Sequence, residues 1–194
     1  MTSVSIREKG LSDFLVKNGY LNTNVLDPVF LLKSNEWSEI ALFPKKSGYV
    51  LTYSFNETDD FFDIASRVAK KLNKKLIVFA YEKKKISSKI FQYISGGPRD
   101  FIGYIMNADF IITNSFHGTA FSVIFRKQFV CIPPKRGRER IDALLNVFGI
   151  SNRIIENDSL DSIKYDVNYN NILIQREISN SLDFLTNSLI VDNI

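Results

Sequence analysis

The sequence predicts an α/β fold in which a Rossmann-like parallel sheet is covered by helices on both faces. Two observations support this prediction. Four apolar runs lack polar alternation, which is typical of strands buried on both sides; they span residues 49–55, 76–81, 110–113 and 129–132. Segments with helical spacing separate these runs, and the connections are short. The 194 residues, 45% of them hydrophobic, are enough for one well-packed domain.

The segment before the first long strand has shorter elements. Residues 4–6 predict a strand, and residues 11–17 predict an amphipathic helix. The next apolar segment, 24–32, is interrupted by a turn signal at Asp27-Pro28. Ser34 is expected to cap a helix that runs through Ile40.

The helices that follow are placed by apolar spacing and by turn residues. Thr58 or Asp59 is expected to start a helix, since apolar residues recur behind it at helical intervals. Gly96-Gly97-Pro98 predicts a sharp turn. Further helices are expected around residues 86–94, 101–106, 117–125 and 141–148. After Asn170 comes a long helix that needs a partner surface for one apolar stripe: Ile174, Ile178, Leu182, Leu185 and Leu189.

Three parts of the chain are distinguished on this basis. Residues 44–48, P-K-K-S-G, have linker composition and form the expected boundary. Residues 1–45 are interpreted as a remnant of an N-terminal domain, 46–155 as the Rossmann-like domain, and 156–194 as a helical tail.

Composition excludes several classes of protein. One cysteine rules out an internal disulfide, and with only one histidine a zinc or iron–sulfur site with nitrogen or sulfur ligands is not expected. A net charge of +4 is too small to indicate nucleic-acid binding. No signal peptide or membrane-spanning run is found, so a cytoplasmic protein is expected.

The single histidine, His117, lies in the segment T-N-S-F-H-G-T, between an expected strand and an expected helix. Ligands bind parallel α/β sheets at the carboxyl ends of strands, and the free N–H groups of a first helical turn attract anions. Asn114 or Ser115 is a suitable helix cap, and Gly118 allows a ligand or the backbone to approach closely. The pattern therefore indicates either an anion site with a proton donor or a histidine used for capping and packing.

A basic loop follows the next strand. Residues 133–140, P-P-K-R-G-R-E-R, place four cations at the same edge of the sheet. Lys135 and Arg136 are interpreted as solvated. Arg140 borders the next helix, and it is the better candidate for a binding site or for an ion pair between domains.

Residues 107–130, N-A-D-F-I-I-T-N-S-F-H-G-T-A-F-S-V-I-F-R-K-Q-F-V, closely resemble the polysaccharide pyruvyl transferase family. Weaker similarities occur in the expected order. They are S-V-S-I-R-E-K at residues 3–9, V-L-D-P-V-F-L-L at 25–32, G-G-P-R-D-F-I-G-Y-I at 96–105, and R-G-x-x-R-I-x-x-L-L at 136–145.

The resemblance implies a fold similar to the C-terminal half of a GT-B glycosyltransferase, with the active site in a cleft between domains. It implies transfer of a pyruvyl group from phosphoenolpyruvate to hydroxyls of a capsular polysaccharide or exopolysaccharide, with a glycan or lipid-linked sugar as acceptor and no cofactor. His117 would act as a general acid or phosphate ligand, and Arg7 would hold the donor's phosphate or carboxylate. Asn114, Ser115, Gly118 and Thr119 would complete the binding turn.

Two departures from the family pattern matter. Many members carry arginine two residues before the histidine, where this chain has Ser115, so Arg138 or Arg140 is expected to substitute for it. The opening strand and helices of an N-terminal domain are also missing, so the chain is expected to be a fragment or a shortened protein. Loss of that domain predicts self-association through exposed apolar area.

Two alternatives stay open at this point. A GT-B-type glycosyltransferase that uses a nucleotide sugar would need a carboxylate for the ribose, for which Glu139 or Asp142 is the candidate. A chain without catalytic activity would retain the anion pocket and serve as a binding or assembly module.

Overall fold

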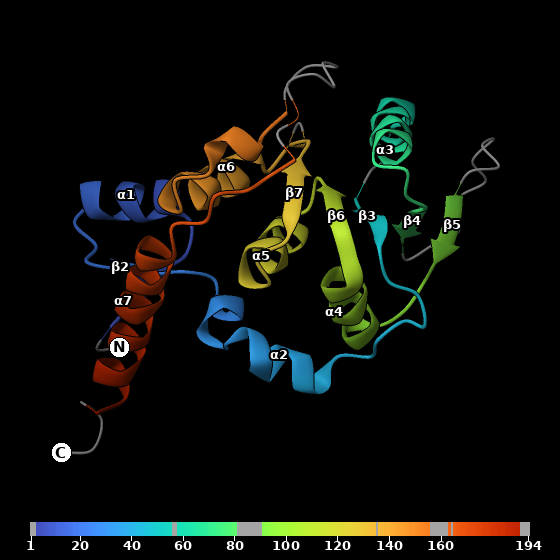
Figure 1. Ribbon diagram of the computed structural model, residues 1–194. Coiled ribbons are helices and arrows are strands. Elements are labelled where there is room, and N and C mark those ends of the chain that lie inside the picture. The colour runs from blue at the N-terminus through green and yellow to red at the C-terminus, as the bar shows by residue number, and fades with distance from the viewer. Residues whose placement is uncertain are drawn as a thin grey trace.

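A computed structural model describes residues 3–55, 58–80, 91–134, 136–155, 163 and 165–190. Its centre is a five-stranded sheet in which every neighbouring pair is parallel. The strands are β3 (Tyr49–Tyr53), β4 (Leu76–Phe79), β5 (Phe91–Ile94), β6 (Ala108–Thr113) and β7 (Gln128–Cys131), and their spatial order is β5-β4-β3-β6-β7 (Figure 1). The predicted fold class is thereby confirmed.

The strand order reverses between β3 and β6. From β3 the chain builds outward through β4 to β5, and it then returns to the other side of β3 to form β6 and β7. At such a reversal the two connections leave the sheet in opposite directions, and ligands of open α/β sheets bind there, outside the carboxyl ends of the strands. The segments at this edge are residues 54–55 after β3 and residues 114–115 after β6.

Each face of the sheet has its own core. One face carries Leu51, Phe79, Ile111 and Phe129, which pack with side chains of α4 (Pro98–Asn107), α5 (Phe116–Ile124) and α6 (Arg138–Val147). The opposite face is covered by α3 (Asp59–Lys71), whose buried residues include Phe61, Ala65 and Val68. Burial on both faces explains why the strands are continuous apolar runs.

The N-terminal segment packs on the face of the sheet that is covered by α4, α5 and α6. It consists of β1 (Ser5–Ile6), α1 (Lys9–Lys17), β2 (Thr23–Asn24), the 3₁₀ helix η1 (Pro28–Leu31) and α2 (Ser34–Ile40), with β1 and β2 paired in parallel. Phe30 of η1 contacts Phe148 edge to face, with 5.3 Å between the ring centroids. Trp37 of α2 contacts Phe121 in the same way, with 5.0 Å between the centroids. These rings pack in the core that also contains residues of α5, so the segment is held against that helix.

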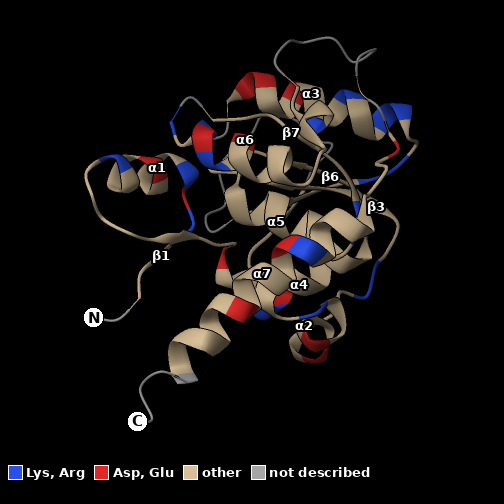
Figure 2. Ribbon diagram, turned by 90° about the vertical axis from the view of Figure 1, so that its left-hand side faces the viewer, with Lys and Arg blue, Asp and Glu red and all other residues tan. Residues whose placement is uncertain are grey.

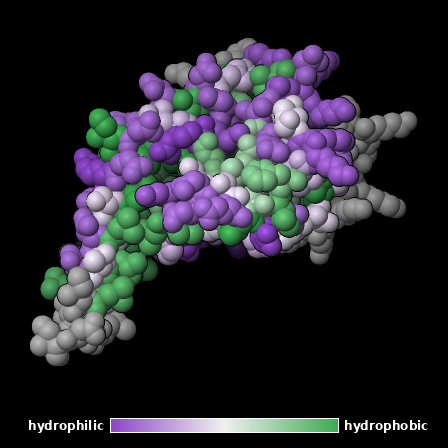
Figure 3. All heavy atoms as spheres, turned by 60° about the horizontal axis from the view of Figure 1, so that its bottom comes forward, coloured by the Kyte–Doolittle hydropathy of each residue, from purple (hydrophilic) through white to green (hydrophobic). Residues whose placement is uncertain are grey.

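The long C-terminal helix α7 (Asn171–Ile190) buries only part of its apolar stripe. Ile174 is buried in the main core, and Ser181 accepts a hydrogen bond from the amide of Leu26 at 2.9 Å. Further along, Leu182, Leu185 and Leu189 are exposed. Figure 3 shows hydrophobic residues gathered along this protruding part of the helix. No helix in the described part of the chain is long and apolar enough to cross a membrane.

Three sequence-based expectations differ from the structure. Residues 91–94, expected at the end of a helix, form strand β5 against β4, and residues 86–90 lie outside the described part. The F-Q-Y-I sequence carries aromatic and β-branched side chains that favour a strand once an edge is available. Lys33, not Ser34, is the N-cap of α2, and α6 begins at Arg138, one turn earlier than expected.

Candidate anion-binding site

The turn between β6 and α5 is built by three side chains. Ser115 is the N-cap of α5, and its hydroxyl accepts from the amide of Gly118 at 3.4 Å. The carbonyl of Ser115 accepts from both the amide and the hydroxyl of Thr119, each at 3.0 Å. The hydroxyl of Thr113 donates to the carbonyl of Tyr53 and accepts from the amide of Ser115. The turn is therefore fixed before any ligand arrives.

Gly118 permits a close approach, as expected, and the element it approaches is strand β6. A Cβ atom on this residue would lie 2.2 Å from Oγ1 of Thr113 and 3.0 Å from its Cβ. Glycine therefore allows helix α5 to approach strand β6, and the fully buried Gly118 and Thr119 face the protein interior. The close approach at this turn is between helix and strand, and it brings the first turn of α5 down to the edge of the sheet.

The side chain of Asn114 links the segments that follow β3 and β6. Its Oδ1 accepts from the amide of Phe55 at 2.9 Å, and its Nδ2 donates to the carbonyl of Phe55 at 2.7 Å. The side chain thus pairs with the backbone after β3 as a neighbouring strand would. It holds together the two connections that diverge at this edge of the sheet.

Replacing Asn114 with alanine should lower the free energy of unfolding by about 1–3 kcal/mol, because the amide and carbonyl of Phe55 lose their partner. Chemical denaturation followed by circular dichroism measures this change. Asn146→Ala on the exposed side of α6 is the matched control and should shift stability by less than about 0.5 kcal/mol. Equal effects of the two substitutions would contradict the structural role of Asn114.

His117 is exposed on the first turn of α5. Its ring contacts Phe116 edge to face, with 5.5 Å between the ring centroids. Within the described part of the chain no hydrogen bond engages the backbone amides of Phe116 and His117, which are the two first-turn donors left without an intrahelical acceptor. The imidazole therefore stands beside open N–H groups, and it is not sealed in the core.

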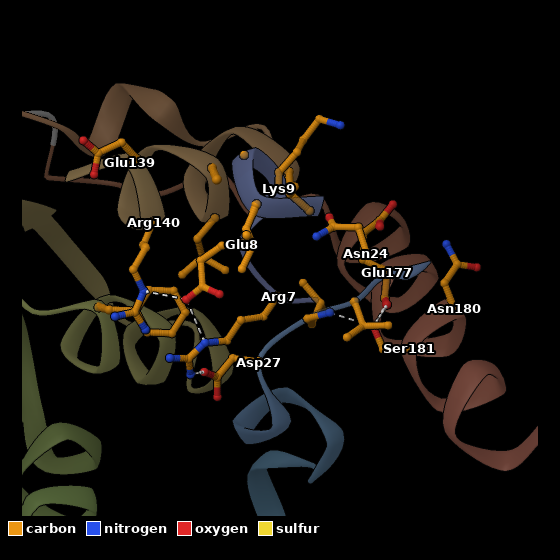
Figure 4. A pocket seen from close by; sticks show the side chains of 18 residues that line it. Arg7, Glu8, Lys9, Asn24, Asp27, Glu139, Arg140, Glu177, Asn180 and Ser181 are labelled. Atoms are coloured by element: carbon orange, nitrogen blue, oxygen red, sulfur yellow. Dashed lines mark hydrogen bonds and ion pairs between the residues drawn. The ribbon is translucent and has the colours of Figure 1, made fainter. Parts of the chain in front are cut away.

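Two arginines from distant segments meet at the ring of Phe116. The guanidinium carbon of Arg140 lies 4.8 Å from the centre of the Phe116 ring, and that of Arg7 lies 5.9 Å from it. Arg7 comes from the loop after β1, and Arg140 comes from the first turn of α6. Figure 4 shows the two guanidinium groups directed toward the same place. Figure 2, which views this side, shows basic and acidic stretches on both α1 and α6.

Two carboxylates hold these arginines. Glu8 Oε1 lies 3.0 Å from Nε of Arg7 and 3.2 Å from Nε of Arg140, so one oxygen serves both cations (Figure 4). The buried Asp27 forms a further ion pair with Nη1 of Arg7, and its other oxygen caps η1 by accepting from the amide of Val29 at 3.1 Å. Burial lowers the pKa of Arg7, but its hydrogen bonds to Glu8 and Asp27 outweigh that effect and leave the pKa raised.

These side chains border a cavity of about 310 Å³. Its walls come from the β1–α1 segment, from β2 and the residues after it, and from α6 and α7. Phe116 lies at the end nearest α5, and the polar side chains on the α7 side are Glu177, Asn180 and Ser181. The cavity can therefore present two guanidiniums to an anion at one end and hydrogen-bonding groups to a neutral polar molecule at the other.

A comparison with known protein families matches residues 2–136 to polysaccharide pyruvyl transferase. The chain belongs to the polysaccharide pyruvyl transferase family. The matched region contains Arg7, Glu8, Asp27, Phe116 and His117, whereas Arg140 lies just beyond it. A search of curated protein sequences finds no match.

Three solved structures are similar to this family member at low sequence identity, and the first of them shows the same fold. UDP-GlcNAc 2-epimerase of Methanocaldococcus jannaschii, solved with UDP-GlcNAc and UDP, superposes with a TM-score of 0.61 at 13% identity, covering 94% of this chain and 61% of that chain. The spinosyn forosaminyltransferase SpnP has a TM-score of 0.46 at 14% identity, with coverage of 83% and 44%. The β-Kdo 2,4 transferase KpsC of Thermosulfurimonas dismutans has a TM-score of 0.40 at 11% identity, with coverage of 78% and 55%. This chain thus spans less than two thirds of each of these chains.

Among the candidates for the family's site, the structure brings Arg7 and Arg140 together at Phe116, and His117 follows directly in the chain. Arg140 also forms an ion pair with Glu8 of the N-terminal segment. An ion pair between two parts of the chain was the other role expected for Arg140 from the sequence. Arg138 is placed elsewhere: it pairs with Asp142 at 3.0 Å and lines a separate depression with Ser151 and Ile154.

Sequence reasoning missed Glu8, Asp27 and Phe116. Glu8 and Asp27 lie in the segments S-V-S-I-R-E-K and V-L-D-P-V-F-L-L that resemble the family, and Asp27 also precedes the turn at Pro28. For Phe116 the signal was the position next to His117. In the described part of the chain, no group of three or more histidine, cysteine or acidic residues could hold a metal ion. Burial raises the pKa of the Cys131 thiol to about 12, so this cysteine is not a nucleophile at neutral pH.

Proposed function

We propose that this protein transfers a pyruvyl group from phosphoenolpyruvate to two hydroxyls of a sugar in a surface polysaccharide, forming a ketal and releasing phosphate. Membership of the polysaccharide pyruvyl transferase family supports this activity. The observation that carries it is the convergence of Arg7 and Arg140 over Phe116, beside the first turn of α5 where His117 is exposed.

The donor carries a phosphate and a carboxylate, and the site offers a matching set of groups. Guanidinium groups form paired hydrogen bonds with both kinds of anion. The open amides of Phe116 and His117 add donors at the positive end of the α5 dipole. In the proposed complex, one anionic group is held by the arginines and the other is held near these amides. The methylene carbon of the donor then faces the imidazole.

The proposed reaction needs no group beyond those side chains and the two substrates. His117 gives its proton to the methylene carbon, which becomes a methyl group, while a sugar hydroxyl adds to the neighbouring carbon. The second hydroxyl then displaces phosphate, and the hydroxyl protons restore the imidazole and protonate the phosphate. General acid–base catalysis of this kind contributes about 10²–10⁴-fold to a rate.

The acceptor is proposed to be a glycan or lipid-linked sugar of a capsule or exopolysaccharide, modified in the cytoplasm. The α7 side of the cavity supports this choice, because Asn180 and Glu177 are side chains of the kind that bind sugar hydroxyls. The nucleotide-sugar alternative is kept as the second candidate, because Glu139 lines the same cavity and could meet a ribose there.

Replacing Arg140 with glutamine should weaken binding of phosphoenolpyruvate about tenfold, because a charge-assisted hydrogen bond at a partly exposed site is lost. Isothermal titration calorimetry measures the dissociation constant. Arg136→Gln is the matched control, since it makes the same charge change on an exposed residue outside the cavity.

The two arginine variants decide between specific binding and general attraction of anions. Equal weakening by both would mean that net charge alone draws the donor to the protein, and the proposed site would be wrong. Binding of UDP-sugars, with no binding of phosphoenolpyruvate and no phosphate release in the presence of sugar acceptors, would establish the nucleotide-sugar alternative instead.

A further inference from the structure

Glu8 occupies the place where an anion would meet both arginines. Its Oε1 is within ion-pair distance of Arg7 and of Arg140, and these two cations come from segments far apart in the sequence. Glu8 is also the N-cap of α1, yet its carboxylate makes no capping hydrogen bond there and turns to the arginines instead. The close-up view shows its side chain between the two guanidinium groups (Figure 4).

In the contact between Glu8 and Arg140, the Nε donor of Arg140 makes no hydrogen bond. Nε of Arg140 is buried and lies 3.2 Å from Oε1 of Glu8, but the pair has no aligned hydrogen bond, and no other acceptor of Nε is found in the described part of the chain. In this arrangement the shared oxygen of Glu8 is aligned with Nε of Arg7 and not with Nε of Arg140. A phosphate has three oxygens on a tetrahedron, so it can give each arginine an aligned acceptor.

Asp27 and Glu8 differ in how easily they can move. Asp27 is buried and is tied to both Arg7 and the amide of Val29, so it fixes one edge of the Arg7 guanidinium. The Glu8 side chain is 34% exposed and borders the cavity, so it can rotate into solvent without any rearrangement of the core. Its departure would leave two positive groups and one negative group around the vacated position.

We propose that Glu8 is an internal counter-ion of the donor site: it holds Arg7 and Arg140 in place while the site is empty, and an incoming anion must displace it. This inference rests on the proposed function for the identity of that anion, phosphoenolpyruvate. Glu8 is thus a positioning residue that competes with the donor. It reduces the affinity for weakly bound anions while keeping the two cations paired.

The variant Glu8→Gln tests whether Glu8 competes with the anion for the arginines, because competition predicts that the variant binds anions more tightly. Glutamine has the same shape and keeps an oxygen acceptor for Arg7, but it removes the charge that competes with the ligand. The dissociation constants of inorganic phosphate and of phosphoenolpyruvate should both fall about three- to tenfold, as expected when partly exposed ion pairs no longer have to be broken. The KM for phosphoenolpyruvate should fall while kcat changes little.

Glu39→Gln provides the matched control. Glu39 is exposed on α2 outside the cavity and undergoes the same change in charge, and it forms no described ion pair with Arg7 or Arg140. It should change both dissociation constants less than twofold. If Glu8 only held the arginines in position, Glu8→Gln would raise both dissociation constants, because the arginines would no longer be held and anions would bind more weakly. Melting temperatures of both variants verify that they are folded.

The outcomes separate this inference from the proposed function. Tighter phosphate binding by Glu8→Gln without turnover of phosphoenolpyruvate by any variant would support the counter-ion and reject pyruvyl transfer. Turnover by the unmodified protein, together with unchanged or weaker anion binding by Glu8→Gln, would overturn the counter-ion alone. Equal effects of Glu8→Gln and Glu39→Gln, or no binding of either anion to any form, would overturn it as well.

Discussion

Replacement of His117 by asparagine is expected to reduce the kcat for pyruvyl transfer by about 10²–10⁴-fold, the contribution of a positioned general acid. The fold should be unaffected, because the imidazole is exposed and its described contact is an edge-to-face meeting with Phe116. Release of phosphate from phosphoenolpyruvate in the presence of sugar acceptors measures the rate. Partial recovery of activity by added imidazole would identify the missing proton donor.

Two results would contradict this role of His117. Unchanged activity of the asparagine variant would return the residue to the packing or capping interpretation that the sequence left open. A loss of donor binding with kcat preserved would make the ring a phosphate ligand and not an acid. Glu39→Gln on the exposed surface of α2 is the control and should retain full activity.

Alanine at position 118 is expected to lower the free energy of unfolding by about 1–3 kcal/mol, the usual cost of overpacking a core. The added Cβ would lie 2.2 Å from Oγ1 of Thr113, which cannot simply turn away because it donates to the carbonyl of Tyr53. Helix α5 would have to move away from β6, and His117 and the open amides would move with it. Activity should therefore fall together with stability.

A second substitution and a control make the test of Gly118 specific. Thr113→Ala removes the nearest atom, so the double variant should be more stable than the sum of the two single effects predicts. Gly10→Ala in α1 adds the same atom into open space and should be neutral or stabilising by up to about 1 kcal/mol. Thermal and urea unfolding measure the stability of the unmodified protein and of all four variants. Purely additive effects of the Gly118 and Thr113 substitutions would contradict the proposed clash.

The fold of this chain does not by itself choose a ligand. At the reversal of strand order, Asn114 joins the segments after β3 and β6 through its pair of hydrogen bonds with Phe55. The arginine pair and the cavity lie to one side of it, between the first turns of α5 and α6 and the N-terminal segment. Ligand choice is thus assigned to side chains, not to the sheet.

The sequence by itself determined strands β3, β4, β6 and β7 and most of the helices, because burial on two faces and helical spacing are local patterns. It also identified the turn after β6 and named Arg7 and Arg140 as candidates. Strand β5 was not found, since a short F-Q-Y-I run becomes a strand only when β4 offers an edge. Gly118 was noticed, but its partner Thr113 could not be known, because that contact depends on how closely α5 approaches the sheet.

Only the tertiary structure decided that Arg7, Glu8 and Arg140 share one place. Ion pairs between segments far apart in the sequence have no local signature: Glu8 is equally compatible with a solvated residue at a helix start, and Arg140 with part of a basic loop. Packing of Phe30 against Phe148 and of Trp37 against Phe121 brings the N-terminal segment to α5 and α6. Those hydrophobic contacts hold the two arginines close enough to act on a single anion.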